Sequence, residues 1–123
     1  MVEINFFRHA TNRQQLAPGE VLFREGDEGT TMFAVIDGDV ELSCAGRVVD
    51  DVGAGGIVGE MALIDNEPRS ATATARTAAC VVPVDARQFT FLVQEHPTFA
   101  ILVMKVMAER LRRTNATVAR DTH

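Results

Sequence analysis

The sequence predicts a mainly β protein: a β-barrel or jelly roll, followed by a short helix and a longer C-terminal helix. Two observations support the barrel. All 9 glycines lie between Gly19 and Gly59, and the segments between them are short and apolar, as in barrels built from short strands and tight turns. After Pro83 the chain changes to helix-forming residues without glycine. A length of 123 residues fits one domain,, with the barrel at about 13–84 and the helices at about 85–118.

Six segments of the barrel region have the length and composition of strands, with apolar or β-branched residues between turn-forming ones. One connection begins with Asp37-Gly38, at the end of the strand expected at Met32–Asp37. This dipeptide favours a two-residue hairpin because it tolerates positive φ. The expected strands are Val21–Arg24, Met32–Asp37, Val40–Ala45, Arg47–Val52, Ala71–Ala75 and Ala78–Pro83.

Two helices are expected after the barrel. Asp85 is a suitable N-cap for a helix over roughly Ala86–Gln94,. Pro97 then opens a longer helix that reaches about Val118 and contains good helix formers,.

The longer helix carries two apolar sets. The first has heptad spacing, which favours pairing with the same helix of a second copy in a homodimer; it consists of Met104, Met107, Leu111, Thr114 and Val118. The second, Phe99, Val103 and Val106, lies on a neighbouring face and can pack on the barrel. Alternatively both sets cover the barrel, because two heptads are too few for an independent coiled coil.

Composition argues against several functional classes. The net charge is −5, whereas nucleic-acid-binding domains usually carry an excess of basic residues,. No apolar run reaches membrane-spanning length, and no signal peptide is recognised, so we expect a cytoplasmic protein. Cys44 and Cys80 have no metal-like or CxxC spacing and are expected to be reduced residues in strands,.

The candidate site is the segment Gly55–Thr72. A glycine-rich turn leads into one or two helical turns over Glu60–Ile64, whose first N–H groups favour an anion. Arg69 follows Pro68 and can form paired bonds to phosphate oxygens. Glu60 would face sugar hydroxyls, because a carboxylate repels a phosphate. The alternative is that Glu60 and Arg69 form a surface ion pair beside a loop.

The run Gly59-Glu60-Met61-Ala62-Leu63-Ile64, followed by Pro68-Arg69-Ser70-Ala71-Thr72, resembles the phosphate-binding cassette of the cyclic-nucleotide-binding domain family. This resemblance extends from about Gly19 to Val118. It implies that Glu60 binds the ribose 2′-hydroxyl and that Arg69 binds the exocyclic phosphate oxygens. Backbone N–H groups of the cassette and the Ser70 hydroxyl would add contacts. The implied ligand-binding residues are Gly59, Glu60, Met61, Ala62, Arg69, Ser70 and Ala71.

The resemblance also bears on the base. Ser70 stands where cGMP binders of this family have Thr, which favours cAMP. The segment 108–115 is similar to the dimer helix of CRP-type sensors, in which two polar residues contact adenine, and Thr114 and Asn115 occupy those positions. The family's N-terminal helix is expected at about Ile4–Asn12. Arg110, Arg112 and Arg113 are interpreted as a solvated basic helix face, with a functional role as the alternative.

Thus we expect a non-catalytic sensor of a cyclic nucleotide, without the helix-turn-helix of CRP regulators and with an unknown downstream protein partner. Two alternatives remain. One is a metal enzyme on the same cupin-like, double-stranded β-helix barrel, but none of the three histidines lies in an expected barrel strand and no metal ligand set is evident,. The other is a degenerate barrel that serves as a protein-interaction module without nucleotide.

Overall fold

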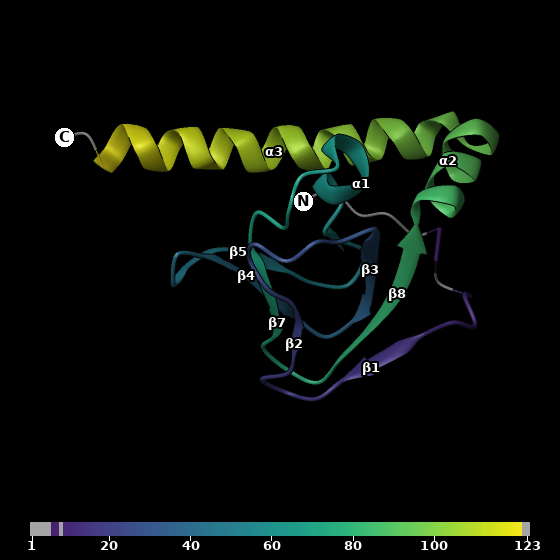
Figure 1. Ribbon diagram of the computed structural model, residues 1–123, viewed down its shortest axis with the longest axis horizontal. Helices are drawn as coiled ribbons and strands as arrows, with labels where there is room; N and C mark the ends of the chain where they lie inside the picture. Colours follow the sequence, from purple (N-terminus) through teal and green to yellow (C-terminus); the bar gives the residue numbers. More distant parts are fainter. Residues whose placement is uncertain (1–5, 8, 122–123) are drawn as a thin grey trace.

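The computed structural model describes residues 6–7 and 9–121, with side chains as far as Thr114. Two four-stranded antiparallel sheets form the barrel, and three helices lie along one side of it (Figure 1). The strands are β1 Gln14–Leu16, β2 Val21–Phe23, β3 Thr31–Asp37, β4 Val40–Cys44, β5 Arg47–Val52, β6 Ile57–Val58, β7 Thr72–Ala75 and β8 Ala79–Asp85. The helices are α1 Met61–Asp65, α2 Ala86–Glu95 and α3 Pro97–Asp121.

The strand order is β1-β8-β3-β6 in one sheet and β2-β7-β4-β5 in the other. Strands far apart in the chain are therefore neighbours, as β1 and β8 are at Gln14 and Val81. This antiparallel, jelly-roll-like arrangement with C-terminal helices confirms the predicted fold class,. Each of the six expected strands and each of the two C-terminal helices has a counterpart within a few residues of its expected bounds.

Two apolar cores hold the layers together. One fills the barrel between the sheets and includes Val35, Val40 and Val81. The other lies between the outer face of the β8-β3 sheet and the helices; it includes Met32, Val84 and the fully buried Phe99. Successive residues of a strand face opposite sides, so β3 and β8 supply both cores. This explains why β8 reads as a nearly continuous apolar run.

The predicted hairpin at Asp37-Gly38 is wrong. Gly38 does adopt a positive φ of 80°, but β3 and β4 belong to different sheets, so the turn carries the chain from one sheet to the other. The hairpin forms one connection later, where β4 pairs with β5 across Ala45-Gly46. Both of these residues have positive φ, the requirement of a type I′ turn,. The dipeptide therefore identified the backbone conformation and not the strand pairing.

The N-terminal expectation also needs correction. Within the expected helix at about Ile4–Asn12, the described residues Phe6, Phe7 and His9 lie in turns. The Ala10 N–H donates to the Phe7 carbonyl, which closes a turn and no helix. Both Phe rings pack edge-on against Phe99 of α3, and this tertiary packing outweighs the local helix preference,.

Capping chemistry explains where α2 begins. Asp85 accepts a hydrogen bond from the Gln88 N–H, and the Gln88 side chain in turn accepts one from the Asp85 N–H. This reciprocal pair is a capping box, and it confirms the predicted N-cap.

The two apolar sets of α3 have different environments. Phe99, Val103 and Val106 are buried against the barrel. In the heptad set, Met107 packs partly on the core, whereas Met104 and Leu111 are 58% and 61% exposed. The alternative in which both sets cover the barrel is therefore wrong for these two residues. The side chain of Val118 lies outside the described residues.

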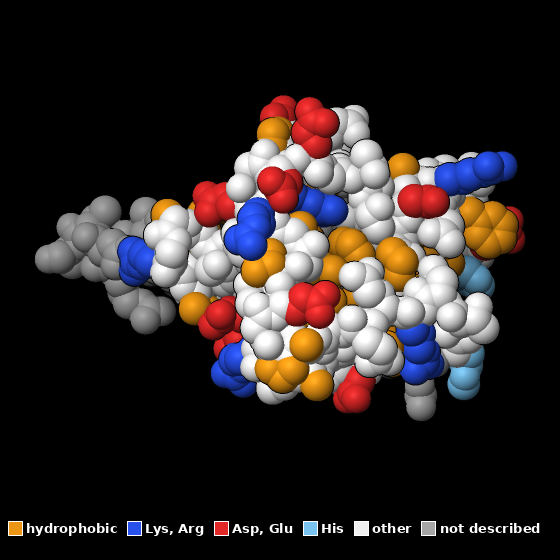
Figure 2. Space-filling model, turned by 60° about the horizontal axis from the view of Figure 1, so that its bottom comes forward, with side chains coloured by type: hydrophobic (Ala, Val, Ile, Leu, Met, Phe, Trp, Pro, Cys, Tyr) orange, Lys and Arg blue, Asp and Glu red, His pale blue; other side chains and the backbone are white. Residues whose placement is uncertain are grey.

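The surface mixes charges of both signs. On the face shown in Figure 2, acidic and basic side chains are interspersed, and the described residues form no continuous basic patch. In the described part of the chain, no helix is long and apolar enough to cross a membrane.

Candidate functional site

A cavity of about 350 Å³ lies between the cassette segment, the β4-β5 hairpin and α3. Its size falls within the range of small-molecule sites, roughly 300–1,000 Å³. The lining residues come from segments far apart in the sequence: Phe23, Leu42, Cys44, Val49, Asp50, Gly59, Glu60, Met61, Ala62, Arg69, Ser70, Ala71, Arg110, Arg113 and Thr114. The fold thus brings all seven predicted cassette residues and Thr114 to one cavity. The side chain of Asn115, the other predicted base contact, lies outside the described residues.

Arg69 occupies a narrow slot at this cavity and is only 7% exposed. Its guanidinium lies 4.2 Å from the centre of the Phe23 ring, a cation–π distance,. Nη1 donates to the Gly59 carbonyl at 3.1 Å, and Nη2 donates to the Thr31 carbonyl at 2.7 Å. The Nε–H is buried and has no hydrogen-bond partner among the described residues. A buried cationic donor without an acceptor is costly, and it indicates a place for an anionic ligand atom.

Two glycines make room for this side chain. A Cβ atom at Gly29 would lie 2.1 Å from Arg69 Nε, and one at Gly59 would lie 2.6 Å from Nη1. The Arg69 backbone is fixed as well, because its N–H donates to the Asp27 carbonyl and its carbonyl accepts from the Gly26 N–H. This role of Gly29 is not predicted from the sequence.

Burial lowers the pKa of the Arg69 guanidinium, while the carboxylates of Asp27 and Glu60 act in the opposite direction,. The site therefore contains a desolvated cation whose charge is only partly balanced by the protein.

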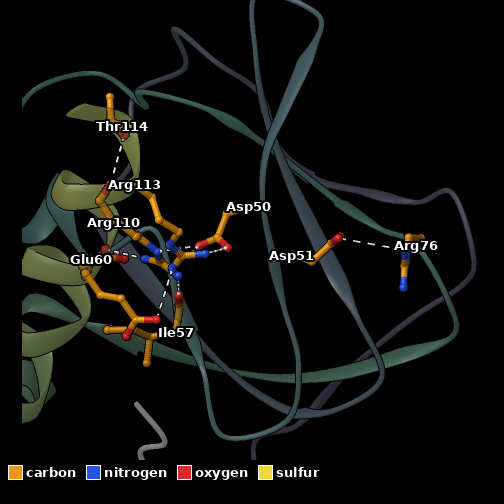
Figure 3. Close-up of polar contacts among 9 residues, drawn as sticks. Asp50, Asp51, Ile57, Glu60, Arg76, Arg110, Arg113 and Thr114 are labelled. Carbon is orange, nitrogen blue, oxygen red and sulfur yellow. Dashed lines mark hydrogen bonds and ion pairs between the residues drawn. The ribbon is translucent and has the colours of Figure 1, made fainter. Parts of the chain in front are cut away.

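Glu60 precedes α1 and is 3% exposed. It does not pair with Arg69, so the surface ion pair considered from the sequence is wrong. Instead its Oε1 atom accepts a bond from Arg110 Nη1 at 2.6 Å (Figure 3). Its Oε2 atom accepts no hydrogen bond from the described residues. One oxygen of the carboxylate therefore remains available at the cavity.

Arg110 and Arg113 of α3 converge on Asp50 of β5. Arg110 Nε lies 3.0 Å from Asp50 Oδ2, and Arg113 Nη1 lies 2.6 Å from Oδ1 (Figure 3). The interpretation of these arginines as a solvated face is therefore wrong for Arg110, whose side chain is 20% exposed. It holds for Arg112, which is exposed.

A sequence signal for Arg110 existed but was missed. Phe99, Val103, Val106 and Arg110 follow one another at spacings of four, three and four, so Arg110 continues the barrel-facing stripe,. A charged residue on a buried stripe needs a counter-charge. Its partner Asp50 lies 60 positions earlier in the chain, and no local pattern points to it.

The remaining predicted residues have less constrained positions. Met61 is 44% exposed and Ser70 is exposed, whereas Ala62 is buried. Thr114 is exposed to the cavity side of α3, and its hydroxyl donates to the Arg110 carbonyl at 3.0 Å. Its oxygen retains the capacity to accept a hydrogen bond from a ligand.

Charged side chains of both signs line the cavity. Three arginines, Arg69, Arg110 and Arg113, line it together with two acidic residues, Asp50 and Glu60. Arg113 also pairs with Glu109 at 3.5 Å, so the three arginines face three carboxylates once this ion-pair partner is counted. The described residues contain no group of three or more His, Cys, Asp or Glu side chains that could hold a metal.

Comparisons with known proteins agree with this geometry. Residues 13–96 match the sequence model described as "Cyclic nucleotide-binding domain". A cyclic nucleotide-gated potassium channel of Rhizobium etli is 36% identical over 99 residues, which make up 80% of this chain and 28% of the channel.

Solved structures give the same result. The structure of cAMP-bound PfPKA-R has a TM-score of 0.75 at 32% identity, over 85% of this chain and 36% of that one. The catabolite activator protein of Thermus thermophilus has a TM-score of 0.78 at 27% identity, over 89% of this chain and 54% of that one. This chain therefore spans 54% or less of each of these three relatives.

Proposed function

Because the chain belongs to the cyclic nucleotide-binding domain family, we propose that its cavity binds a cyclic nucleotide, cAMP in preference to cGMP, as a sensor that does no chemistry on the ligand. The observation that carries this proposal is the buried Nε–H of Arg69, which has no hydrogen-bond partner among the described residues. Arg69 lines the same cavity as Glu60, whose Oε2 atom accepts no hydrogen bond from the described residues.

The cyclic phosphate fits the arginine end. A 3′,5′-cyclic phosphate carries one negative charge, which suits the buried Arg69 guanidinium. Its exocyclic oxygens can accept from the Arg69 guanidinium, and such charge-assisted bonds are about twice as strong as neutral ones. The ligand would thereby relieve the unsatisfied donor.

The ribose fits the Glu60 end. A cyclic nucleotide has one free ribose hydroxyl, at the 2′ position, and Glu60 Oε2 can accept a hydrogen bond from it while Oε1 keeps its bond to Arg110,. The metal-enzyme alternative gains no support from this arrangement, whose described polar groups are suited to binding a phosphate and a hydroxyl.

The preference for adenine draws on two residues. Ser70 stands at the position where the family resemblance associates Thr with cGMP. Thr114, whose hydroxyl proton is directed to the Arg110 carbonyl, offers lone pairs that suit the adenine amino group better than the guanine carbonyl.

In this proposal residues 1–123 act as one sensor domain in the cytoplasm. Ligand binding changes how α3 rests on the barrel, and the exposed face of α3 transmits the change to a second copy or a downstream protein. The channel relative, of which this chain matches 28%, supports the proposal of a role within a larger protein.

Isothermal titration with cAMP, cGMP and 5′-AMP tests the ligand. We expect cAMP to bind at micromolar concentration or tighter, roughly −8 kcal/mol, cGMP to bind more weakly and 5′-AMP to bind weakly. If neither cyclic nucleotide gives heat or a thermal shift, the interaction module without nucleotide becomes the better explanation.

Variants of Arg69 test the site. Arg69→Ala removes bonds worth about 1.5–3 kcal/mol each and should weaken cAMP binding at least about tenfold. Arg69→Lys keeps the charge without the planar fork and should recover part of the loss. The matched control is Arg112→Ala, an exposed arginine of α3 that should leave affinity unchanged. Unchanged affinity in Arg69→Ala would place the ligand elsewhere.

A further inference from the structure

We propose that Phe23 is a positioning residue: the face of its ring holds the Arg69 guanidinium in place, so that the Nε–H without a partner among the described residues is directed at the ligand phosphate. This inference rests on the proposed function and deepens it. It adds to the cassette an aromatic residue of β2, a strand that lies outside the cassette segment.

The ring and the guanidinium are in direct contact. Arg69 Cζ lies over the Phe23 ring, 4.2 Å from its centre, and both residues line the cavity. The face of an aromatic ring carries partial negative charge and attracts a cation, most strongly where water is excluded. Because Arg69 is only 7% exposed, this contact belongs to the stronger, desolvated kind.

The ring stabilises the cation without occupying its donors. The carbonyl groups of Gly59 and Thr31 already accept bonds from Nη1 and Nη2. A carboxylate in place of the ring would accept a further bond and compete with a phosphate for the guanidinium. The ring instead attracts the charge as a whole, and the Nε–H keeps no partner among the described residues. A phosphate oxygen can therefore take this donor.

An irregularity of β2 aims the ring at this place. β2 and β7 are neighbours in their sheet (Figure 1), where Val21 lies opposite Thr74. Phe23 then lies opposite Ala73, so two steps along β2 match one step along β7. This is a β-bulge with Leu22 as the extra residue. In a regular strand Leu22 and Phe23 would face opposite sides, but here both pack on the barrel core.

The ring is itself fixed by its neighbours. It stacks on Phe33 of β3, with 6.1 Å between the ring centres and an angle of 25° between the ring planes. The turn that follows β2 also holds the backbone of Arg69, whose N–H donates to the Asp27 carbonyl and whose carbonyl accepts from the Gly26 N–H. One short segment thus places both the ring and the arginine.

A guanidinium that is held in advance should bind a phosphate better than a mobile one. Ordering one long side chain on binding lowers affinity by roughly two- to tenfold, and the contact with Phe23 meets this cost before the ligand arrives. The alternative is that Phe23 only fills the barrel core. In that case an apolar side chain without a ring would serve equally well.

The experiment titrates cAMP by calorimetry into the wild type and variants of position 23. Phe23→Leu and Phe23→Met keep an apolar side chain but remove the ring, whereas Phe23→Tyr keeps the ring face. Phe91→Leu is the matched control, because Phe91 is 59% exposed on α2 and lies outside the lining of this cavity. Circular dichroism and thermal melting check folding, and the adaptable Met variant serves if the Leu variant does not fold.

We expect Phe23→Leu and Phe23→Met to bind cAMP about three- to tenfold more weakly than the wild type, because the guanidinium is then ordered only on binding. Phe23→Tyr, which keeps the cation–π contact, and Phe91→Leu should stay within about twofold of the wild type. Phe23→Leu is then repeated in an Arg69→Ala background. There it should change affinity by less than about twofold, because residues that act through one contact are not additive.

An equal loss in both backgrounds would show that Phe23 acts on the core or directly on the ligand, and would overturn the inference. Wild-type affinity in Phe23→Leu and Phe23→Met, or an equal loss in Phe23→Tyr, would overturn it as well, since the ring face would then not matter. Tighter binding without the ring would mean that the ring withholds Arg69 from the phosphate, the opposite of the role proposed. If the wild type gave no heat with cAMP, the proposed function would fail and this inference with it, whereas a wild type that binds leaves only the inference to be decided by the variants.

Discussion

Arg69 lies in its slot because Gly29 and Gly59 have no side chains to occupy the same space. A methyl group at Gly29 would fall 2.1 Å from Arg69 Nε, a separation that non-bonded atoms do not adopt. Arg69 is also stacked on Phe23, so the guanidinium has little freedom to move aside. Arg69 can therefore hold this position only if residue 29 is glycine.

Gly29→Ala should displace the Arg69 guanidinium and weaken cAMP binding about tenfold or more, by loss of charge-assisted bonds. Titration calorimetry measures the change. Gly53→Ala is the matched control, because a Cβ there meets only Asp39 Oδ1 at an ordinary 3.4 Å. If the two variants bound cAMP with equal affinity, the inference that Gly29 makes room for the Arg69 guanidinium would be wrong.

Cys44 offers a second probe of the cavity. Burial raises the pKa of its thiol, and the neighbouring Glu25 carboxylate, 3.7 Å from the sulfur, raises it further. Since the thiolate is the reactive form, alkylation at pH 8 should be slower than for a free thiol and should accelerate as pH rises. Glu25→Gln should accelerate it at constant pH, measured by mass spectrometry in a Cys80→Ser background.

Bound cAMP should slow the alkylation of Cys44, because this residue lines the cavity. The buried Cys80 in the opposite background, Cys44→Ser, should show no such protection. A rate at Cys44 that saturating cAMP leaves unchanged would place the ligand away from β4.

At the scale of elements, α3 presents different faces to different surroundings. Val103 and Val106 face the barrel, Arg110 contacts Glu60 and Asp50, and Met104 and Leu111 are exposed. The sequence predicted the division into two apolar faces, because helical spacing is a local property. It did not predict the ion pairs, because their acceptors, Glu60 before α1 and Asp50 of β5, lie 50 and 60 positions away.

The exposed face predicts self-association. We expect the wild type to sediment as a dimer and Leu111→Glu to sediment as a monomer at the same concentration, because a charge in an apolar helix seam is unfavourable. Arg112→Gln, one position off the seam, should behave as the wild type. If the wild type and Leu111→Glu both sedimented as monomers, the prediction that the heptad set of α3 forms a dimer interface would be wrong.

The other elements show where sequence patterns fail. β3 and β8, with seven residues each, were found from their apolar runs, whereas β1 and β6 have only three and two residues and were missed. In such short strands the pairing partner decides the conformation, as β8 does for β1,. The same applies to Asp37-Gly38, whose local conformation was predicted but whose strand pairing depends on the whole barrel.

At the scale of the whole molecule, the cavity joins parts of the chain that are remote in sequence. The cassette, β4, β5 and α3 all contribute side chains to it. The cassette could be predicted because its residues are close together in sequence. The contributions of Asp50 and Arg110 could not, because they become neighbours only when α3 packs on the barrel.

A ligand that contacts several elements should stabilise the fold as a unit. At a concentration one hundred times its dissociation constant, cAMP should add about 2.7 kcal/mol to the free energy of unfolding. For a domain of this size that raises the melting temperature by about 10 °C or more. Differential scanning calorimetry with and without cAMP measures the shift, and 5′-AMP at the same concentration should give little. A constant melting temperature would contradict binding to the folded state.

The length of α3 has a mechanical consequence. The helix continues for 11 residues after Arg110, roughly 17 Å at ~1.5 Å per residue, and its C-terminal end extends past the barrel (Figure 1). If Arg110 is treated as a pivot, a rotation of about 10° would move the far end of this rod by about 3 Å. The helix would thus work as a lever arm, which converts a slight displacement at the sugar end of the cavity into a movement large enough for another molecule to detect.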